Sequence, residues 1–195
     1  MESYLLILLI SFIVIYKYFN ESEVTYEYFY EGKKKKKYLV RNIPDKNDAV
    51  KTLFKIESSL LLLINKLLED INQIKKDGMY EYINRLDGAM DNVKIQESSA
   101  DSKYTSYSVN KGELLVFCIR SKTNNEIHDI NDLIYVAIHE LAHIACTEVG
   151  HTPLFFEINK YLVNKAIDYN IYEYINYSIN KRDYCGMELN INIAG

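Results

Sequence analysis

A His-Glu-Leu-Ala-His motif at residues 139–143 constrains this chain more than any other feature. Residues i and i+4 lie one above the other on one helix face, so His139 and His143 can direct their imidazoles at a single metal ion. Glu140 can then reach a water molecule at that ion and act as a general base. Three of the chain's four histidines fall between positions 139 and 151. The motif therefore predicts a helix with a catalytic metal site, for which zinc is the expected ion.

The alternative is a helix that contains two histidines for packing alone. Residues 130–138 are mostly apolar, so the motif lies on a helix that we expect to be largely buried. Burying two imidazoles and a carboxylate without partners would cost several kcal/mol for the charged group. A bound metal removes that cost, and we favour the metal site on this ground.

A third ligand is expected from the segment after the motif. Gly150 suits a turn with positive φ, which can swing His151 back toward the metal. A new helix is expected to start at Thr152-Pro153, with the threonine as its cap and the proline in its first position. Glu148 and Glu157 are the alternative third ligands, and either would give a site of two histidines and one carboxylate. We favour His151, because an imidazole at a glycine turn closes the triad most simply.

Further segments flank the motif in a recognisable order. They are residues 115–120, 127–129, 136–143, the pair 150–151, the Pro-Leu-Phe-Phe run 153–156 and the tail 184–187. This pattern resembles the WLM and SprT-like zinc metallopeptidases, most closely the WLM-type proteins of large nucleocytoplasmic DNA viruses. The resemblance covers about residues 103–190 and indicates a viral origin.

The resemblance implies an α+β fold with a zincin-like minimal metallopeptidase core, made of a helix, a small sheet and the active helix. It also implies a gluzincin-like site with His139, His143 and His151 on zinc and Glu140 as the base. The cellular members of this family cleave proteins that are crosslinked to DNA.

The N-terminus is the second informative segment. Residues 4–16 carry no charge, and Lys17 is followed by two aromatic residues. As a helix, residues 4–19 would span about 24 Å, slightly less than the roughly 30 Å hydrocarbon core of a bilayer. A cleaved signal peptide would have a basic start and a small-residue cleavage site, and neither is present. We therefore predict a single-pass membrane anchor over residues 1–20. The lysines that follow predict a soluble domain facing the cytoplasm or the virion interior.

The rest of the chain divides into three expected segments. Residues 21–45 form a strand hairpin, with strands at 24–30 and 38–40 around a lysine-rich turn. Residues 46–102 form the helical part of the core. Residues 103–195 form the zinc-metallopeptidase core. The helical part has one long helix over 48–76, a short helix over 80–86 and a loop at 98–102. The long helix has an apolar stripe made of Leu53, Leu60, Ile64, Leu67, Ile71 and Ile74.

Charge and cysteine content restrict the partners and the compartment. The chain has 195 residues and a net charge of −4, so it lacks the basic character expected of a nucleic-acid-binding domain. The one basic run, residues 33–37, is interpreted as a solvated hairpin tip or juxtamembrane patch. Cys118, Cys146 and Cys185 are widely spaced and odd in number, which predicts no disulfide framework and fits a reducing compartment.

A protein or peptide substrate is the expected partner. Residues 104–109 and 113–121 are predicted to form a strand pair around residues 110–112. If residues 114–120 form the edge strand above the active helix, a substrate can add to it as a further strand. Its scissile carbonyl would then meet the zinc, with Glu140 deprotonating the attacking water.

Several other residues are candidates by type alone. Met187 is a candidate packing floor under the zinc. His128 is not expected to be a ligand, because its neighbours Asp129 and Asn131 are typical helix-capping residues. The candidates for stabilising the oxyanion are Tyr161, Tyr169 and Tyr184.

Three functional classes compete. The favoured one is a membrane-anchored zinc metallopeptidase that hydrolyses peptide bonds through a zinc-activated water. The second is a non-catalytic virion or membrane structural protein that keeps a zincin fold. The presence of Glu140 argues against it, because a purely structural site closes with a fourth protein ligand. The third is a DNA–protein-crosslink protease, for which a basic surface would be expected.

Overall fold

The computed structural model describes residues 2–20, 23–191 and 193–194, and these form an α+β fold, which confirms the predicted class. The helices are α1 (Glu2–Asn20), α2 (Lys46–Glu69), α3 (Ile71–Lys76), α4 (Tyr80–Met90), α5 (Ile130–Ala145) and α6 (Pro153–Asp168). The strands are β1 (Val24–Glu31), β2 (Lys34–Arg41), β3 (Lys94–Glu97), β4 (Tyr107–Val109), β5 (Leu114–Phe117), β6 (Arg182–Tyr184) and β7 (Met187–Leu189). The division into four segments stays a prediction.

Within the described residues, strands β1 to β5 form one mixed sheet in the order β1-β2-β3-β5-β4. The outer pairs β1–β2 and β5–β4 are antiparallel, and the inner pairs β2–β3 and β3–β5 are parallel. The predicted strand pair is therefore present as β4 and β5. Residues 114–120 were considered as the edge strand of the sheet. They are not, because β5 is paired on both sides and β4 is the edge strand.

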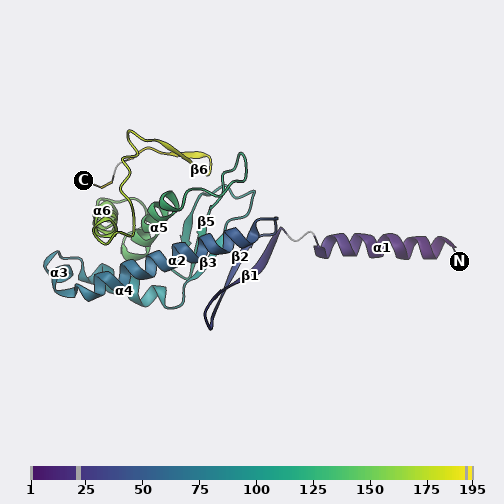
Figure 1. Cartoon of the computed structure of the whole chain (residues 1–195), viewed down its shortest axis with the longest axis horizontal. Coiled ribbons are helices and arrows are strands. Elements are labelled where there is room, and N and C mark those ends of the chain that lie inside the picture. The colour runs from purple at the N-terminus through teal and green to yellow at the C-terminus, as the bar shows by residue number, and fades with distance from the viewer. Residues whose placement is uncertain (1, 21–22, 192, 195) are drawn as a thin grey trace.

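Helix α2 lies across β1, β2 and β3 and contacts α4, α5 and α6 (Figure 1). Its apolar side chains recur every three or four residues, and Leu53, Leu60 and Leu67 from this stripe are buried. The helix was predicted to run on to residue 76, but it ends at Glu69 and α3 begins at Ile71. Asp70 leaves the helical conformation, with φ −101° and ψ 34°, and divides the two helices.

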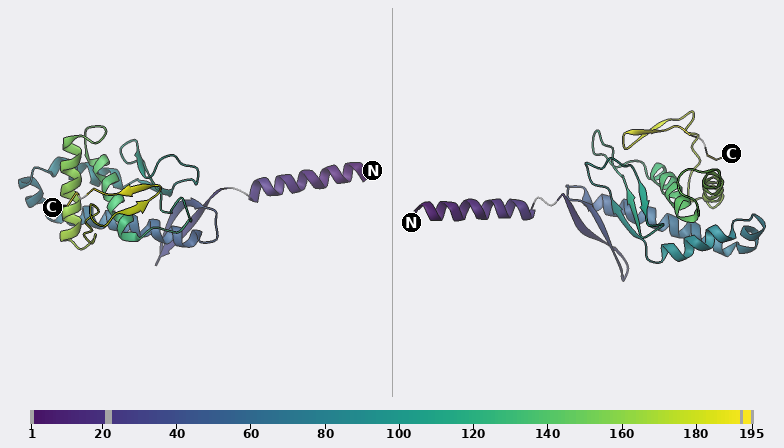
Figure 2. Two further views of the ribbon diagram at one scale, coloured as in Figure 1. Left: turned by 90° about the horizontal axis from the view of Figure 1, so that it is seen from above. Right: turned by 180° about the vertical axis from the view of Figure 1, so that it is seen from behind.

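Helix α1 lies apart from the rest of the chain in all views (Figures 1 and 2). The transmembrane anchor predicted over residues 1–20 is not supported, because no helix among the described residues is long and apolar enough to cross a membrane. The predicted orientation of the soluble domain stays a prediction. Met1 lies outside the described residues.

The lysine run is mostly strand. Only Lys33 lies in the turn after Gly32, while Lys34–Arg41 is β2, so the prediction of a lysine-rich tip was wrong in extent. Lys35 lies over the Tyr28 ring at 3.8 Å from the centroid, and Lys37 lies over the Tyr26 ring at 3.7 Å. The tyrosines alternate with inward-facing residues along β1, which places the rings and the lysines on the same outer face.

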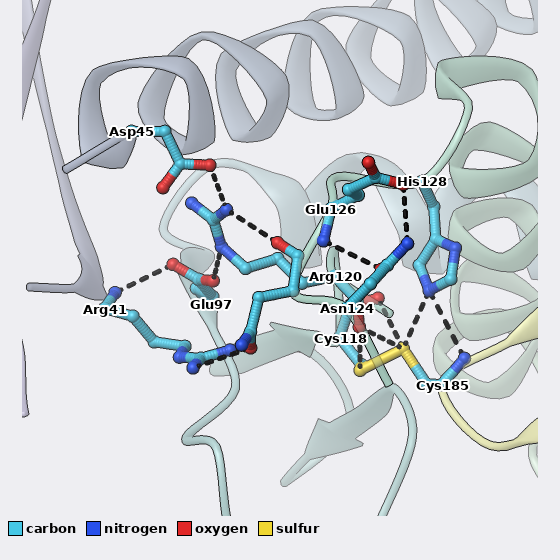
Figure 3. A network of polar contacts seen from close by, with 10 residues as sticks. Arg41, Asp45, Glu97, Cys118, Arg120, Asn124, Glu126, His128 and Cys185 are labelled. Carbon is cyan, nitrogen blue, oxygen red and sulfur yellow. Dashed lines mark hydrogen bonds and ion pairs between the residues drawn. A yellow bond between two sulfur atoms is a disulfide. The ribbon is translucent and has the colours of Figure 1, made fainter. Parts of the chain in front are cut away.

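A disulfide joins Cys118, just after β5, to Cys185 in the β6–β7 turn (Figure 3). The prediction of no disulfide was wrong, and the reducing compartment inferred from it loses its support. The two cysteines are 67 residues apart, and pairing over that distance cannot be read from spacing. The backbone N–H of Cys185 also donates to His128 Nε2 at 3.3 Å, so β6 and β7 are held against the end of the sheet by two contacts.

A buried ion pair lies beside this disulfide (Figure 3). Arg120 Nε donates to Glu97 Oε1 at 2.7 Å, and both side chains are at most 2% exposed. Arg120 also pairs with Asp45 at the start of α2, and Glu97 accepts the backbone N–H of Arg41 at 2.7 Å. The network therefore connects β2 and β3 with the segment that follows β5 and with the residue that precedes α2.

Replacing Arg120 tests this network. Arg120→Met leaves the Glu97 carboxylate buried without its cation, and we expect the free energy of unfolding to fall by about 3–5 kcal/mol in urea titrations. The double variant Arg120→Met/Glu97→Gln should lose less than the sum of the two single losses. Arg85→Met, at an exposed position on α4, is the control. A loss below about 1 kcal/mol for Arg120→Met would contradict the role given to this pair.

Candidate metal centre

Helix α5 carries the His-Glu-x-x-His motif and is largely buried. Asp129 caps its start, because its carboxylate accepts the backbone N–H of Asn131 at 2.8 Å. Twelve of its sixteen residues are buried, so the helix packs on almost every side. It contacts α2, α4, α6 and β4. His139 and His143 are half-buried on the one face that opens outward, whereas Glu140 is 5% exposed.

The segment after α5 returns His151 to the first two histidines. The helix ends at Ala145, and Gly150 has φ +87°, as the predicted turn requires. Thr152 then caps α6, with its hydroxyl accepting the backbone N–H of Phe155 at 3.3 Å, and Pro153 occupies the first turn. Both predicted helix-start residues therefore have their expected places.

The three histidines converge through the same ring atom. His151 Nε2 lies 3.1 Å from His139 Nε2 and 3.2 Å from His143 Nε2. In a tetrahedral zinc site with Zn–N bonds of 2.0–2.1 Å, ligand nitrogens lie about 3.3 Å apart. The residues present therefore fit a zinc ion. Among the described residues, this is the one group of three His, Cys, Asp or Glu side chains placed to share an ion.

The alternative ligands do not join this group. Glu148 and Glu157 are exposed, and neither belongs to the set of converging ligand atoms. His128 also lies elsewhere, where its Nε2 accepts the backbone N–H of Cys185.

Phe155 of α6 supports all three rings and was not singled out from the sequence. It is fully buried, and its ring stacks on His143 with centroids 4.1 Å apart. The His139 and His151 rings contact it edge-on at 4.9 Å. Met187, a candidate for this role by residue type alone, is 49% exposed and lines the cavity instead. The sequence signals for Phe155 were its place in the Pro-Leu-Phe-Phe run and its position three residues after the Thr152 cap.

The electrostatics of the site favour neutral imidazoles. Burial, together with the neighbouring His143 and His151, lowers the pKa of His139 to about 3. Burial also lowers the pKa of His143 to about 4, together with the nearby His151 and Lys111. A neutral imidazole is the form that binds a metal. These two rings are therefore in the ligand form at neutral pH.

Glu140 has the opposite shift. Burial raises its pKa to about 7, although a hydrogen bond from the backbone N–H of Ser108 opposes the shift. A carboxylate with a pKa close to the working pH can both accept and return a proton.

A cavity of about 800 Å³ opens over the histidines. One wall is the edge strand β4 with the residues before it, and another is the C-terminal segment from Tyr184 to Ile193. The apolar residues of that segment that line the cavity are Met187, Leu189, Ile191 and Ile193. The site therefore lies in an open, partly apolar cavity large enough for several side chains.

Of the three tyrosines considered for the oxyanion, one lies in this cavity. Tyr184 lines it and shares a hydrogen bond of 2.5 Å with the Ser106 hydroxyl. Burial raises the pKa of Tyr184, which keeps the phenol protonated at neutral pH. Tyr161 donates to Asp77, and neither Tyr161 nor Tyr169 lines the cavity.

Comparisons with known proteins place the chain among viral sequences. It is 40% identical to the uncharacterized protein R325 of Acanthamoeba polyphaga mimivirus over 152 residues, which cover 78% of this chain and 76% of that protein. It is 35% identical to the uncharacterized protein 042R of invertebrate iridescent virus 3, over 49% of this chain and 56% of that protein. No protein-family model matches the chain.

Among solved structures, the fold is similar to that of Wss1 from Saccharomyces cerevisiae. The TM-score is 0.41 and the identity 18%, over 67% of this chain and 88% of that chain.

The chain belongs to the protein family that includes mimivirus R325. Both reported sequence relatives are viral, which supports the predicted viral origin.

The lowered pKa values of the histidines predict how the metal-free protein responds to acid. His139 and His143 contribute stability that is fully present above about pH 6.5 and is lost as the pH falls toward about 4 and then 3. Glu140 has the opposite effect on stability, because its raised pKa favours the neutral carboxyl in the folded protein. Its contribution to the free energy of unfolding is present below about pH 4.5 and is lost as the pH rises to about 7.

Urea unfolding in the presence of a chelator measures this effect. Between pH 6.5 and pH 4, the wild type should lose more free energy of unfolding than His139→Gln, which has no imidazole to protonate at that position. Parallel losses in the two proteins would show that His139 is not held neutral by burial.

Proposed function

We propose that this protein is a zinc-dependent metallopeptidase with a zincin-like core of the WLM type. In this proposal His139, His143 and His151 hold the zinc, and Glu140 is the catalytic base. The observation that carries it is the position of His151 Nε2, 3.1 Å from that of His139 and 3.2 Å from that of His143, with the buried carboxylate of Glu140 next to His139 on α5.

The site contains the parts that peptide hydrolysis requires. A zinc ion held by these histidines supplies a Lewis acid that polarises the scissile carbonyl and lowers the pKa of water. Glu140 accepts a proton at its carboxylate as the water oxygen attacks the carbonyl carbon. It returns that proton to the nitrogen as the C–N bond breaks and the amine leaves. A pKa of about 7 suits Glu140 to both transfers.

The edge strand supports a peptide as the substrate. Within the described residues, β4 is paired on one side by β5 and its other edge lines the cavity. An extended peptide can add to a free strand edge through its main chain, which gives affinity with little sequence preference. Because the Ser108 N–H contacts Glu140, a peptide on this edge has its backbone beside the base.

Replacing the base separates catalysis from metal binding. Glu140→Gln keeps the size of the side chain, and Glu140 is not a zinc ligand in this proposal. Elemental analysis of the full-length variant should therefore show that zinc is retained. Cleavage of an unfolded, fluorescently labelled protein should fall on the order of 10²-fold or more, because the base is absent.

Glu157→Gln is the matched control, since it removes an exposed carboxylate close to the site. It should keep both zinc and activity. Equal activity of the wild type and Glu140→Gln would exclude Glu140 as the base. Loss of zinc in Glu157→Gln would make that carboxylate a ligand.

A further inference from the structure

The loop between α5 and α6 has to hold the third histidine without regular structure of its own. Residues 147–151 are exposed, and they make no backbone–backbone hydrogen bond with any other described residue. His151 nevertheless lies with its Nε2 within 3.2 Å of the other two histidines. Some other group must therefore fix the path of the loop.

Lys111, from the turn between β4 and β5, contacts this loop at three places. Its ammonium donates to the backbone carbonyl oxygens of His143 at 3.1 Å, Cys146 at 2.8 Å and Glu148 at 2.9 Å. An ammonium has three donors and no acceptor, so all of its hydrogen-bonding capacity is used here. The three carbonyls come from the last turn of α5, its C-cap residue and the loop that follows.

The position also suits the charge of the side chain. The last carbonyls of a helix have no partner within the helix and form the negative end of its dipole. A cation placed there satisfies the carbonyls and is attracted by the dipole. One of the three carbonyls belongs to His143 itself, so the lysine connects directly to a ligand residue.

The turn that carries Lys111 is fixed in an uncommon backbone conformation. Asn110 and Lys111 have φ of +48° and +55°, a region that side chains other than glycine seldom adopt. Gly112 follows with φ +111°, and a Cβ at this position would lie 3.1 Å from Ala89 Cβ and 3.3 Å from Ile144 Cγ2. The turn is therefore packed tightly between α4 and α5. Its strain is maintained by packing, as is common where backbone geometry serves a site.

We propose that Lys111 is a positioning residue of the metal centre. It ties the end of α5 to the loop that follows and thereby keeps His151 in register with His139 and His143. This inference rests on the proposed zinc site, and it concerns a residue whose ammonium is bonded to backbone carbonyls and is not one of the three converging ligands.

Metal affinity tests the proposal in the full-length protein. Lys111→Met keeps most of the aliphatic stem but removes the three hydrogen bonds. We expect its zinc Kd, measured by competition with a chromophoric chelator, to rise about 10–100-fold, as is typical when an outer contact of a ligand is removed. Lys122→Met is the matched control, because Lys122 also donates to a backbone carbonyl, that of Ser102 at 2.9 Å, outside the loop. Its Kd should stay at the wild-type value.

Cobalt supplies a spectroscopic measurement of ligand geometry. The visible absorption of the Co²⁺-loaded wild type should change in band position and intensity in Lys111→Met and remain unchanged in Lys122→Met. Restoring the ammonium, by alkylating Lys111→Cys with 2-bromoethylamine, should recover both the zinc Kd and the cobalt spectrum. Cys146 is fully buried, which protects it from the reagent.

The outcomes separate the two proposals. If the wild type binds zinc and Lys111→Met has the same Kd and cobalt spectrum, Lys111 only stabilises the fold and the inference is wrong. If the wild type itself binds no zinc, the metal centre is wrong and the inference fails with it.

Discussion

The burial of helix α5 is the constraint on which the rest of the structure depends. With most of its length packed against α2, α4, α6 and β4, the helix has only one face left for polar side chains. His139 and His143 occupy that face, one helical turn apart. Because burial disfavours their charged forms, the rings stay neutral and their lone pairs are free for an ion. The same burial raises the pKa of Glu140 into the range of a working base.

The surrounding elements each fix one side of the site. Helix α6 supplies Phe155 under the three imidazoles, and the β4–β5 turn supplies Lys111 to the loop before His151. The C-terminal segment closes another wall of the cavity and is joined to the sheet through the Cys118–Cys185 disulfide. Segments far apart in sequence are therefore combined around one helix. The site depends on tertiary packing as much as on its motif.

The features that could be predicted from the sequence are local ones. The spacing of His139 and His143 follows from helix geometry, and Gly150 and Thr152 have backbone roles that their side chains prescribe. The α+β class was implied by the family resemblance. His151 was preferred over two carboxylates by ligand chemistry, and it is the residue that the fold brings to the pair.

The features that were missed depend on contacts between distant segments. Which strand is the edge depends on the pairing of β3 with β5, and no local pattern specifies a parallel neighbour. The disulfide, the stacking of Phe155 and the contacts of Lys111 likewise join separate elements. The break of the long helix at Asp70 was an error of length, in which a continuing apolar pattern was taken for a continuing helix.

The central claim is that three histidines hold a zinc ion whose fourth position is open. X-ray absorption at the zinc K-edge of the full-length protein tests it most directly. We expect three imidazole nitrogens at about 2.0–2.1 Å and one further light atom that is not an imidazole, and His151→Ala should lose one imidazole contribution. A sulfur neighbour at about 2.3 Å, or a fourth imidazole, would contradict it.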